Sequence, residues 1–96
     1  MRRLRLSRAA KNDLVEIGVY TAGRWGEAQC ERYLTQLDER IRLLQRRPES
    51  GRSCDDLKPG AWRITEGRHV IFYRFSEQRV DVLRVLHVQM LPERYL

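Results

Sequence analysis

Residues 67–87 read GRHVIFYRFSEQRVDVLRVLH, and this stretch decides the fold. Two runs rich in Val, Ile, Phe, Tyr and Leu, at 67–75 and 79–87, flank the polar tripeptide Ser-Glu-Gln. Such a pair of runs around a short polar turn predicts a β-hairpin. Because successive side chains of a strand point to opposite faces, the alternation within each run assigns every residue to a face.

Apolar side chains occupy both faces of this predicted hairpin, with two arginines among them. In the second run, Val80, Val82 and Leu86 alternate with Leu83 and Val85. A sheet with one face in water normally separates its apolar from its polar side chains. We therefore expect helices of this chain to cover one face, and a second polypeptide to cover part of the other.

Two helices are predicted before the hairpin. Ser7 is a favourable N-cap, and the residues after it form an apolar stripe at spacings of three and four. This helix should end near Trp25-Gly26, and a second helix with a longer apolar stripe should run over 27–47, ended by Pro48. The short connection between them makes the helices antiparallel.

Shorter segments complete the pattern. Residues 2–6 predict an edge strand, 48–60 a loop, 61–65 another strand, and 88–96 a tail in which Pro92 argues against further strand. The order is β-α-α-β-β-β. We predict an α+β fold in which an antiparallel helical hairpin packs on one face of a small, mainly antiparallel sheet. The 96 residues make one domain, 1–96.

Composition narrows the classes of partner. The formal net charge is +6 and the pI about 10.0, which favours RNA, DNA, an acidic peptide or an acidic protein surface. The two cysteines, Cys30 and Cys54, form no disulfide framework, and no apolar run resembles a signal peptide or a membrane span. We expect a cytoplasmic protein that does not engage a membrane.

An ordered set of short motifs spans nearly the whole chain, from about Leu4 to Met90, and this set resembles the ParE toxins of the RelE/ParE superfamily. The resemblance is carried by Ser7-x-x-Ala10, Asp13-Leu14, Ile17, Tyr20, Trp25-Gly26, Pro48-x-x-Gly51, Leu57-Lys58-Pro59-Gly60, Arg63, Gly67-x-His69-x-Ile71-Phe72-Tyr73-Arg74 and Arg84-Val85-Leu86-His87.

The resemblance implies a toxin of a type II toxin-antitoxin system, neutralised by a ParD-like antitoxin. ParE-type toxins are associated with inhibition of DNA gyrase, whereas the RelE branch cleaves mRNA on the ribosome. The resemblance also implies that the antitoxin brings the DNA-binding module, so this chain alone would make no sequence-specific contact with DNA. We expect inhibition of gyrase by binding, with ribosome-dependent mRNA cleavage as the alternative.

The two functions require different residues. A ribonuclease needs proton-transfer groups and cations for the phosphorane, and His87, Arg63 and Arg84 are the candidates. RelE-like ribonucleases often carry catalytic aromatic or imidazole groups just after the last strand, but here the next tyrosine after His87 is Tyr95. We therefore expect no catalytic residue. The expected contacts to antitoxin or target are Arg63, Arg74, Arg84, Tyr73, Phe75, Met90 and Tyr95.

No metal or cofactor is expected. Cys30, Cys54, His69 and His87 match no zinc-ligand spacing, and the chain has no Gly-rich phosphate loop. At least one of the strand arginines should pair with a carboxylate, from this chain or from the antitoxin.

Overall fold

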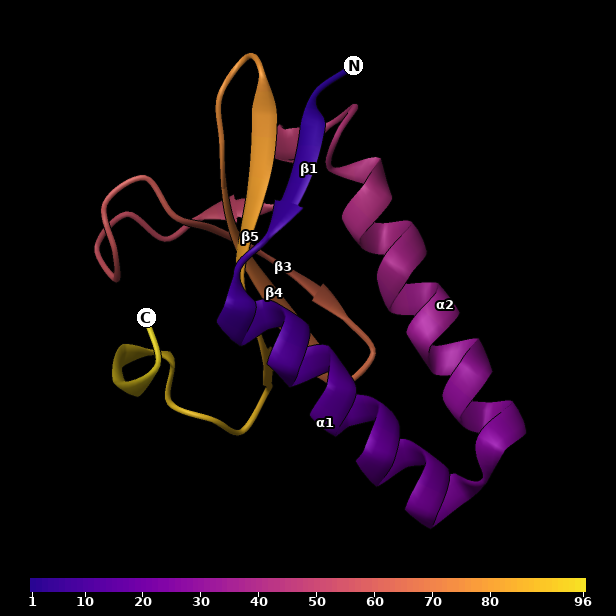
Figure 1. The fold of residues 1–96 in the computed structure, drawn as a ribbon. Helices are drawn as coiled ribbons and strands as arrows, with labels where there is room; N and C mark the ends of the chain where they lie inside the picture. Colours follow the sequence, from indigo (N-terminus) through magenta and orange to yellow (C-terminus); the bar gives the residue numbers. More distant parts are fainter.

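A computed structural model describes residues 1–96 and places two helices on one side of a five-stranded sheet (Figure 1). The strand order is β1-β5-β4-β3-β2, with β1 parallel to β5 and the other pairs antiparallel. The elements are β1 (Arg3–Leu6), α1 (Arg8–Trp25), α2 (Glu27–Leu43), β2 (Arg52–Ser53), β3 (Trp62–Glu66), β4 (His69–Phe75) and β5 (Arg79–His87), with 3-10 turns at Pro48–Ser50 and Pro92–Arg94.

This arrangement confirms the predicted α+β class and the antiparallel helical hairpin on one face of the sheet. It adds one strand to the predicted order. Arg52 and Ser53, expected in a loop, pair with Arg63 and Trp62 of β3 and form the edge strand β2. Two residues are too few to show the period-2 alternation by which a strand is recognised in sequence.

Local chemistry fixes both ends of α1. The Ser7 Oγ accepts a hydrogen bond of 2.9 Å from the Ala10 N–H, which confirms the predicted N-cap. Gly26 has φ of 90°, a conformation that favours glycine, and its N–H donates to the Ala22 carbonyl. The chain therefore reverses at Gly26 and α2 begins at the next residue.

The second helix is shorter than predicted, since α2 ends at Leu43 and not near Arg47. The backbone then tightens, because the N–H groups of Gln45 and Arg46 donate to carbonyls three residues back. The residue before a proline disfavours the helical conformation, and Arg47 accordingly has φ of −133° and ψ of 69°. Pro48 thus begins a separate 3-10 turn.

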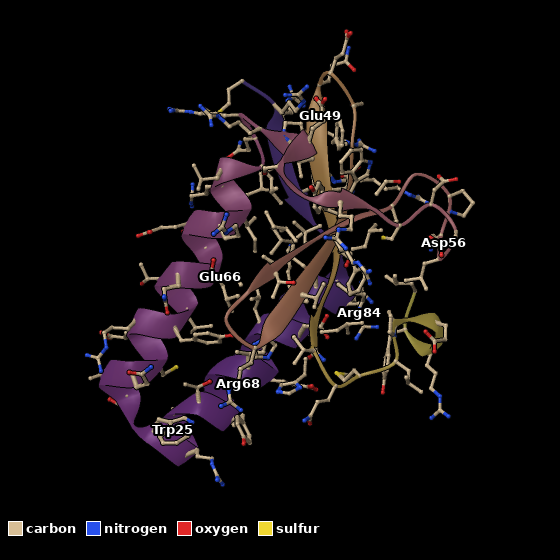
Figure 2. The ribbon with its side chains drawn as sticks, turned by 180° about the vertical axis from the view of Figure 1, so that it is seen from behind. Trp25, Glu49, Asp56, Glu66, Arg68 and Arg84 are labelled. Carbon is tan, nitrogen blue, oxygen red and sulfur yellow. The ribbon has the colours of Figure 1, made fainter.

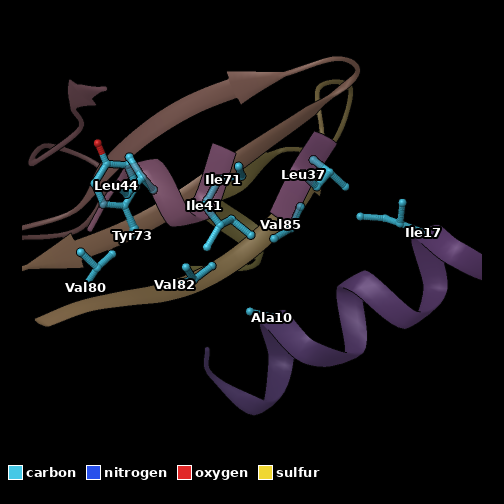
Figure 3. Close-up of a cluster of buried hydrophobic side chains, with 10 residues drawn as sticks. All are labelled: Ala10, Ile17, Leu37, Ile41, Leu44, Ile71, Tyr73, Val80, Val82 and Val85. Atoms are coloured by element: carbon cyan, nitrogen blue, oxygen red, sulfur yellow. The ribbon is translucent and has the colours of Figure 1, made fainter. Parts of the chain in front are cut away.

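The main core lies between the helical hairpin and the sheet (Figure 3). Each helix contributes its apolar stripe, and the strands contribute one of their two faces. The buried members are Ala10, Ile17, Leu37, Ile41, Leu44, Ile71, Tyr73, Val80, Val82 and Val85.

A β-bulge interrupts the regular alternation predicted for β5. Phe72 of β4 pairs with Arg84, but the next residue, Tyr73, pairs with Val82, so Leu83 has no partner. An extra residue of this kind shifts all later side chains by one position relative to the faces. As a result Val82 and Val85 lie in the same core, although the sequence alternation placed them on opposite faces.

The apolar part of the second face of the sheet is covered by this chain itself, which corrects the expectation that another polypeptide covers it. Residues 54–61 and the C-terminal tail lie on the side of the sheet away from α2 (Figure 1). Their side chains build a second cluster. It contains Cys54, Ala61, Phe72 and Leu86, with Leu57, Val70, Leu83, Met90 and Leu96 packed against them.

Candidate functional site

An apolar groove opens on the helix side of the molecule, between β1, α1 and α2. Its volume is about 460 Å³, and seven of its nine lining residues are hydrophobic. The lining residues are Leu4, Leu6, Leu14, Val15, Gly18, Val19, Leu34, Asp38 and Ile41. A cleft of this size with a mainly apolar lining and one carboxylate fits an apolar side-chain surface better than it fits a charged ligand.

Helix α1 is apolar on its outer side as well as on its core side. Val15 and Val19 at the groove are 63% and 70% exposed, while Ile17 between them is buried. Farther along, Tyr20 and Trp25 are also exposed, and Figure 2 shows Trp25 at the connection between the two helices. Several large apolar side chains on one helix, all in water, are typical of a protein interaction surface.

Close packing of the helices forms the floor of this groove. Gly18 faces α2, and a Cβ at this position would lie 3.3 Å from the Leu34 Cδ1 atom. The glycine therefore lets α1 approach α2 closely, so that Leu14, Leu34 and Ile41 form a continuous apolar floor.

Arg84 is the strand arginine that pairs with a carboxylate of this chain. Its Nε and NH2 groups donate to the two carboxylate oxygens of Asp13 on α1, each at 2.8 Å. The hydrogen bonds to Asp13 raise the pKa of Arg84, so the guanidinium stays charged. Figure 2 shows Arg84 beside the C-terminal tail. Its NH1 donates to the Tyr95 carbonyl, and its guanidinium lies 5.4 Å from the Tyr95 ring centroid.

Two of the expected contact residues lie in the core or next to it. Tyr73 is fully buried, and its hydroxyl donates to the Pro48 carbonyl, so it lies in the core and not on the contact surface expected from the sequence. Burial raises the pKa of Tyr73 to about 12. Phe75 is half-buried against Trp62 and lies under the guanidinium of Arg2.

The tail residues among the expected contacts are partly used within the chain. Met90 is half-buried and packs on the second cluster. Tyr95 remains 41% exposed beside Arg84. Of these two side chains, Tyr95 is the more available to a partner.

Arg63 and Arg74 are exposed on the second face of the sheet. Arg63 lines a polar groove of about 470 Å³ together with Arg52, its cross-strand neighbour, and the hydroxyl residues Ser50 and Thr65. Arg74 donates to the Pro59 carbonyl at 3.1 Å. Neither Arg63 nor Arg74 forms an ion pair, so both can meet a partner's negative charge.

The two histidines form a cross-strand pair at the far end of the hairpin. The rings of His69 and His87 meet edge to face with their centroids 5.4 Å apart. The Tyr33 hydroxyl and the His69 Nδ1 share a hydrogen bond of 2.5 Å. Burial, with a smaller contribution from neighbouring His87, lowers the pKa of His69 to about 4, so His69 is neutral at pH 7.

Two of the three ribonuclease candidates, Arg84 and His87, already make hydrogen bonds within the chain. Arg63 on β3 and Arg84 on β5 are both paired with Phe72 on β4, the strand between them. Their Cα atoms are therefore about 10 Å apart. The guanidinium of Arg84 is bound by Asp13. The His87 Nδ1 accepts the N–H of Gln89 at 3.1 Å, so neutral His87 carries its proton on Nε2.

Sequence reasoning did not identify the helix-side groove. The sequence does indicate this groove, because Val15 and Val19 are apolar residues that lie outside the core stripe of α1. Apolar residues on a solvent-facing helix surface can be recognised in this way once the core stripe has been assigned.

No group of three or more His, Cys, Asp or Glu side chains is arranged to hold a metal ion. None of the helices combines the length and the apolar character needed to cross a membrane.

The sequence of this chain was compared with protein families and with individual proteins. Residues 4–92 match the family model described as the ParE toxin of the type II toxin-antitoxin system parDE. The chain is 42% identical to Toxin ParE1 of Mycobacterium tuberculosis (strain ATCC 25618 / H37Rv) over 92 residues, covering 95% of this chain and 94% of that protein. It is 38% identical to Toxin ParE1 of Caulobacter vibrioides over 96 residues, covering 100% and 99%.

Two solved structures share the fold. One is the chromosomal ParDE toxin-antitoxin system from P. aeruginosa, with a TM-score of 0.78 and 20% identity over 91% of this chain and 96% of that chain. The other is the RelBE2 toxin-antitoxin complex from Mycobacterium tuberculosis, with a TM-score of 0.69 and 22% identity over 90% and 96%. The match to the family model and the identity to two ParE1 toxins over nearly full length show that this chain belongs to the ParE toxin family of type II toxin-antitoxin systems.

Proposed function

We propose that this toxin acts by binding DNA gyrase, without catalysis of its own, and that a ParD-like antitoxin neutralises it by occupying the helix-side groove. The observation that carries the antitoxin part is the groove between β1, α1 and α2, with Val15 and Val19 exposed at its rim. The gyrase part is supported by membership of the ParE family, to which gyrase inhibition is attributed.

An amphipathic helix of the antitoxin is the ligand that suits the groove best. Helix-in-groove recognition places apolar anchors at helical spacing into a cleft lined by apolar side chains. Val15 and Val19, one turn apart on α1, would pack against such anchors. Burial of these valines would provide much of the affinity, at about 1.5 kcal/mol or more for each side chain.

Charge would guide the encounter between the two proteins. This chain carries a formal net charge of +6, and Arg63 and Arg74 are exposed without a carboxylate partner. An extended acidic segment of the antitoxin that reaches these arginines would increase the association rate more than the affinity. The sequence-specific contacts to operator DNA would come from the antitoxin and not from this chain.

Binding without catalysis is also supported by the state of the ribonuclease candidates. A base and an acid must both lie within hydrogen-bond reach of the substrate, and cations must face the developing phosphorane charge. Here Asp13 neutralises Arg84, and His87 uses its Nδ1 lone pair for the N–H of Gln89. Ribosome-dependent mRNA cleavage remains the second candidate, because Arg63 and Arg52 are free and adjacent.

The two candidates predict different cellular responses. Induced expression of this chain should trigger the DNA-damage response while mRNA stays intact, and the purified chain should inhibit supercoiling by gyrase. Rapid mRNA cleavage without DNA damage would instead assign the mRNA-cleaving function. Co-expression with a cognate ParD-like antitoxin should abolish the response, and addition of the purified antitoxin should abolish the inhibition in vitro.

A further inference from the structure

A continuous band of arginines crosses the second face of the sheet from one edge to the other. Alternation along each strand places these residues opposite the side chains that enter the main core. The strand registers make them neighbours: Arg3 pairs with Arg79, Asp81 lies between Arg5 and Arg74, and Arg63 pairs with Arg52. All six arginines are exposed: Arg3, Arg5, Arg52, Arg63, Arg74 and Arg79.

The band is poorly neutralised by the rest of the chain. Within the band, Asp81 is the one carboxylate paired with these arginines in the strand register. It forms an ion pair of 2.9 Å with Arg79. The covering loop contributes Asp55 and Asp56 nearby, and Asp55 already accepts the Gly60 N–H. Arg3, Arg5, Arg52, Arg63 and Arg74 have no ion-pair partner within the chain.

Two of the register pairs place like charges directly opposite each other. Arg3 faces Arg79, and Arg52 faces Arg63. Like charges at such positions destabilise a sheet, because their Cβ atoms are about 5 Å apart. This destabilisation is removed when a polyanion supplies the missing negative charge.

We propose that this arginine band binds the phosphate backbone of duplex DNA without reading its base sequence. Arginine forks suit phosphate oxygens, and phosphate contacts position a protein on DNA without specifying sequence. Arg79 and Arg63, the nearer members of the two like-charged pairs, lie two strands apart (about 10 Å) and four residues apart along β4 (about 13 Å), so their Cα atoms are about 16 Å apart. A charged surface of this extent can contact several phosphates of one duplex. This inference does not depend on gyrase being the target.

Duplex DNA fits the face better than two other polyanions. Single-stranded nucleic acid is usually held by exposed aromatic side chains on which bases stack. Phe72 of the sheet is 2% exposed beneath the loop and tail, and the ring of Tyr95 in the tail already lies against the Arg84 guanidinium. An acidic protein segment would find no apolar anchor on this face, because its apolar side chains are covered in the same way, so such a segment could speed an encounter but would not bind tightly here.

The test is binding of the purified chain to a fluorescein-labelled 30-base-pair duplex of mixed sequence, followed by anisotropy at several salt concentrations. The double variant Arg52→Gln/Arg63→Gln removes one like-charged pair from the band. The matched control, Arg32→Gln/Arg42→Gln, removes the same charge from exposed positions on α2. Circular dichroism and thermal unfolding establish that both variants fold.

We expect the band variant to lose at least tenfold in affinity at low salt, and its salt slope to fall by about 2, or about 0.9 for each lost phosphate contact. The control should change affinity less than threefold, and a second duplex of unrelated sequence should bind equally well. Equal losses in the two double variants would overturn the proposal. Tighter binding to single-stranded DNA, or to a polyglutamate peptide, would also overturn it and assign the face to that class of ligand.

Discussion

Asp13 of α1 and Arg84 of β5 lie 71 residues apart in the chain and form a two-pronged ion pair, with both N···O distances at 2.8 Å. The same carboxylate accepts the backbone N–H of Val85 at 2.9 Å. Arg84 follows the unpaired Leu83 of the bulge, where the ladder of hydrogen bonds is disturbed. Asp13 thus neutralises a partly buried cation and supplies an acceptor next to the irregular part of the ladder.

Replacement of Asp13 should therefore be costly. Asp13→Ala leaves the Arg84 guanidinium without a counter-charge and the Val85 N–H without an acceptor, so we expect a loss of about 3 kcal/mol in the free energy of unfolding. Asp38→Ala is the control, because it breaks an exposed i,i+4 pair with Arg42 and should cost less than about 1 kcal/mol. Urea denaturation measures both, and similar values for the two variants would contradict the argument.

Gly51 lies against the core and has no room for a side chain. A Cβ there would be 2.3 Å from the Tyr73 hydroxyl and 2.5 Å from the Arg63 carbonyl oxygen. Gly51→Ala should displace the hydroxyl from its bond to Pro48 and cost about 2–4 kcal/mol. Gly23→Ala in α1 is the control, because no atom lies within 4 Å and helix propensity predicts a gain of up to about 1 kcal/mol. Thermal unfolding should shift in opposite directions for the two variants.

The elements with strong local signals were predictable from sequence. The hairpin turn is one of these, since Ser76 accepts hydrogen bonds from the N–H groups of Gln78 and Arg79, as its short polar loop suggested. Leu57 of the preceding loop packs on the second cluster. The bulge at Leu83 was not predictable, because it depends on contacts between segments far apart in the sequence.

The cover of the second sheet face was also hidden from sequence reasoning. It depends on small or isolated residues such as Cys54, Ala61 and Leu96, which have no periodic pattern. Tyr73 was expected on the contact surface because an aromatic strand residue has no sequence mark that separates core from surface. The β-strand register and the turn at Pro48 decide its burial.

The histidine pair predicts how stability depends on pH. The pKa of His69 is about 4 in the folded chain and about 6.5 when unfolded, so the unfolded chain binds more protons between these values. Stability should therefore fall as the pH drops from 6.5 towards 4, by roughly 1–2 kcal/mol because the ring is partly solvated. His69→Gln should lose most of this slope in urea titrations at pH 4.5 and 7.5. An unchanged slope would show that another group causes it.

The helix-side groove predicts where the antitoxin is sensitive to substitution. Val15→Glu and Val19→Glu place a charge on an apolar contact surface, so each should weaken antitoxin binding at least tenfold, while folding is unaffected because both positions are exposed. Val88→Glu is the matched control, since Val88 is 49% exposed on the tail outside the groove. Isothermal titration calorimetry with the purified antitoxin measures the affinity of each variant. An equal effect of Val88→Glu would place the contact elsewhere.

Substitution of His87 separates inhibition by binding from catalysis. Neutral His87 carries its proton on Nε2, because its Nδ1 accepts the Gln89 N–H, so a role as general base would first require loss of that bond. His87→Ala should therefore leave growth inhibition and gyrase inhibition within about twofold of the parent. The backbone bond it removes contributes about 1 kcal/mol, so the variant should remain folded and bind antitoxin. Loss of growth inhibition in a variant that passes both of those checks would favour mRNA cleavage by His87 over inhibition by binding.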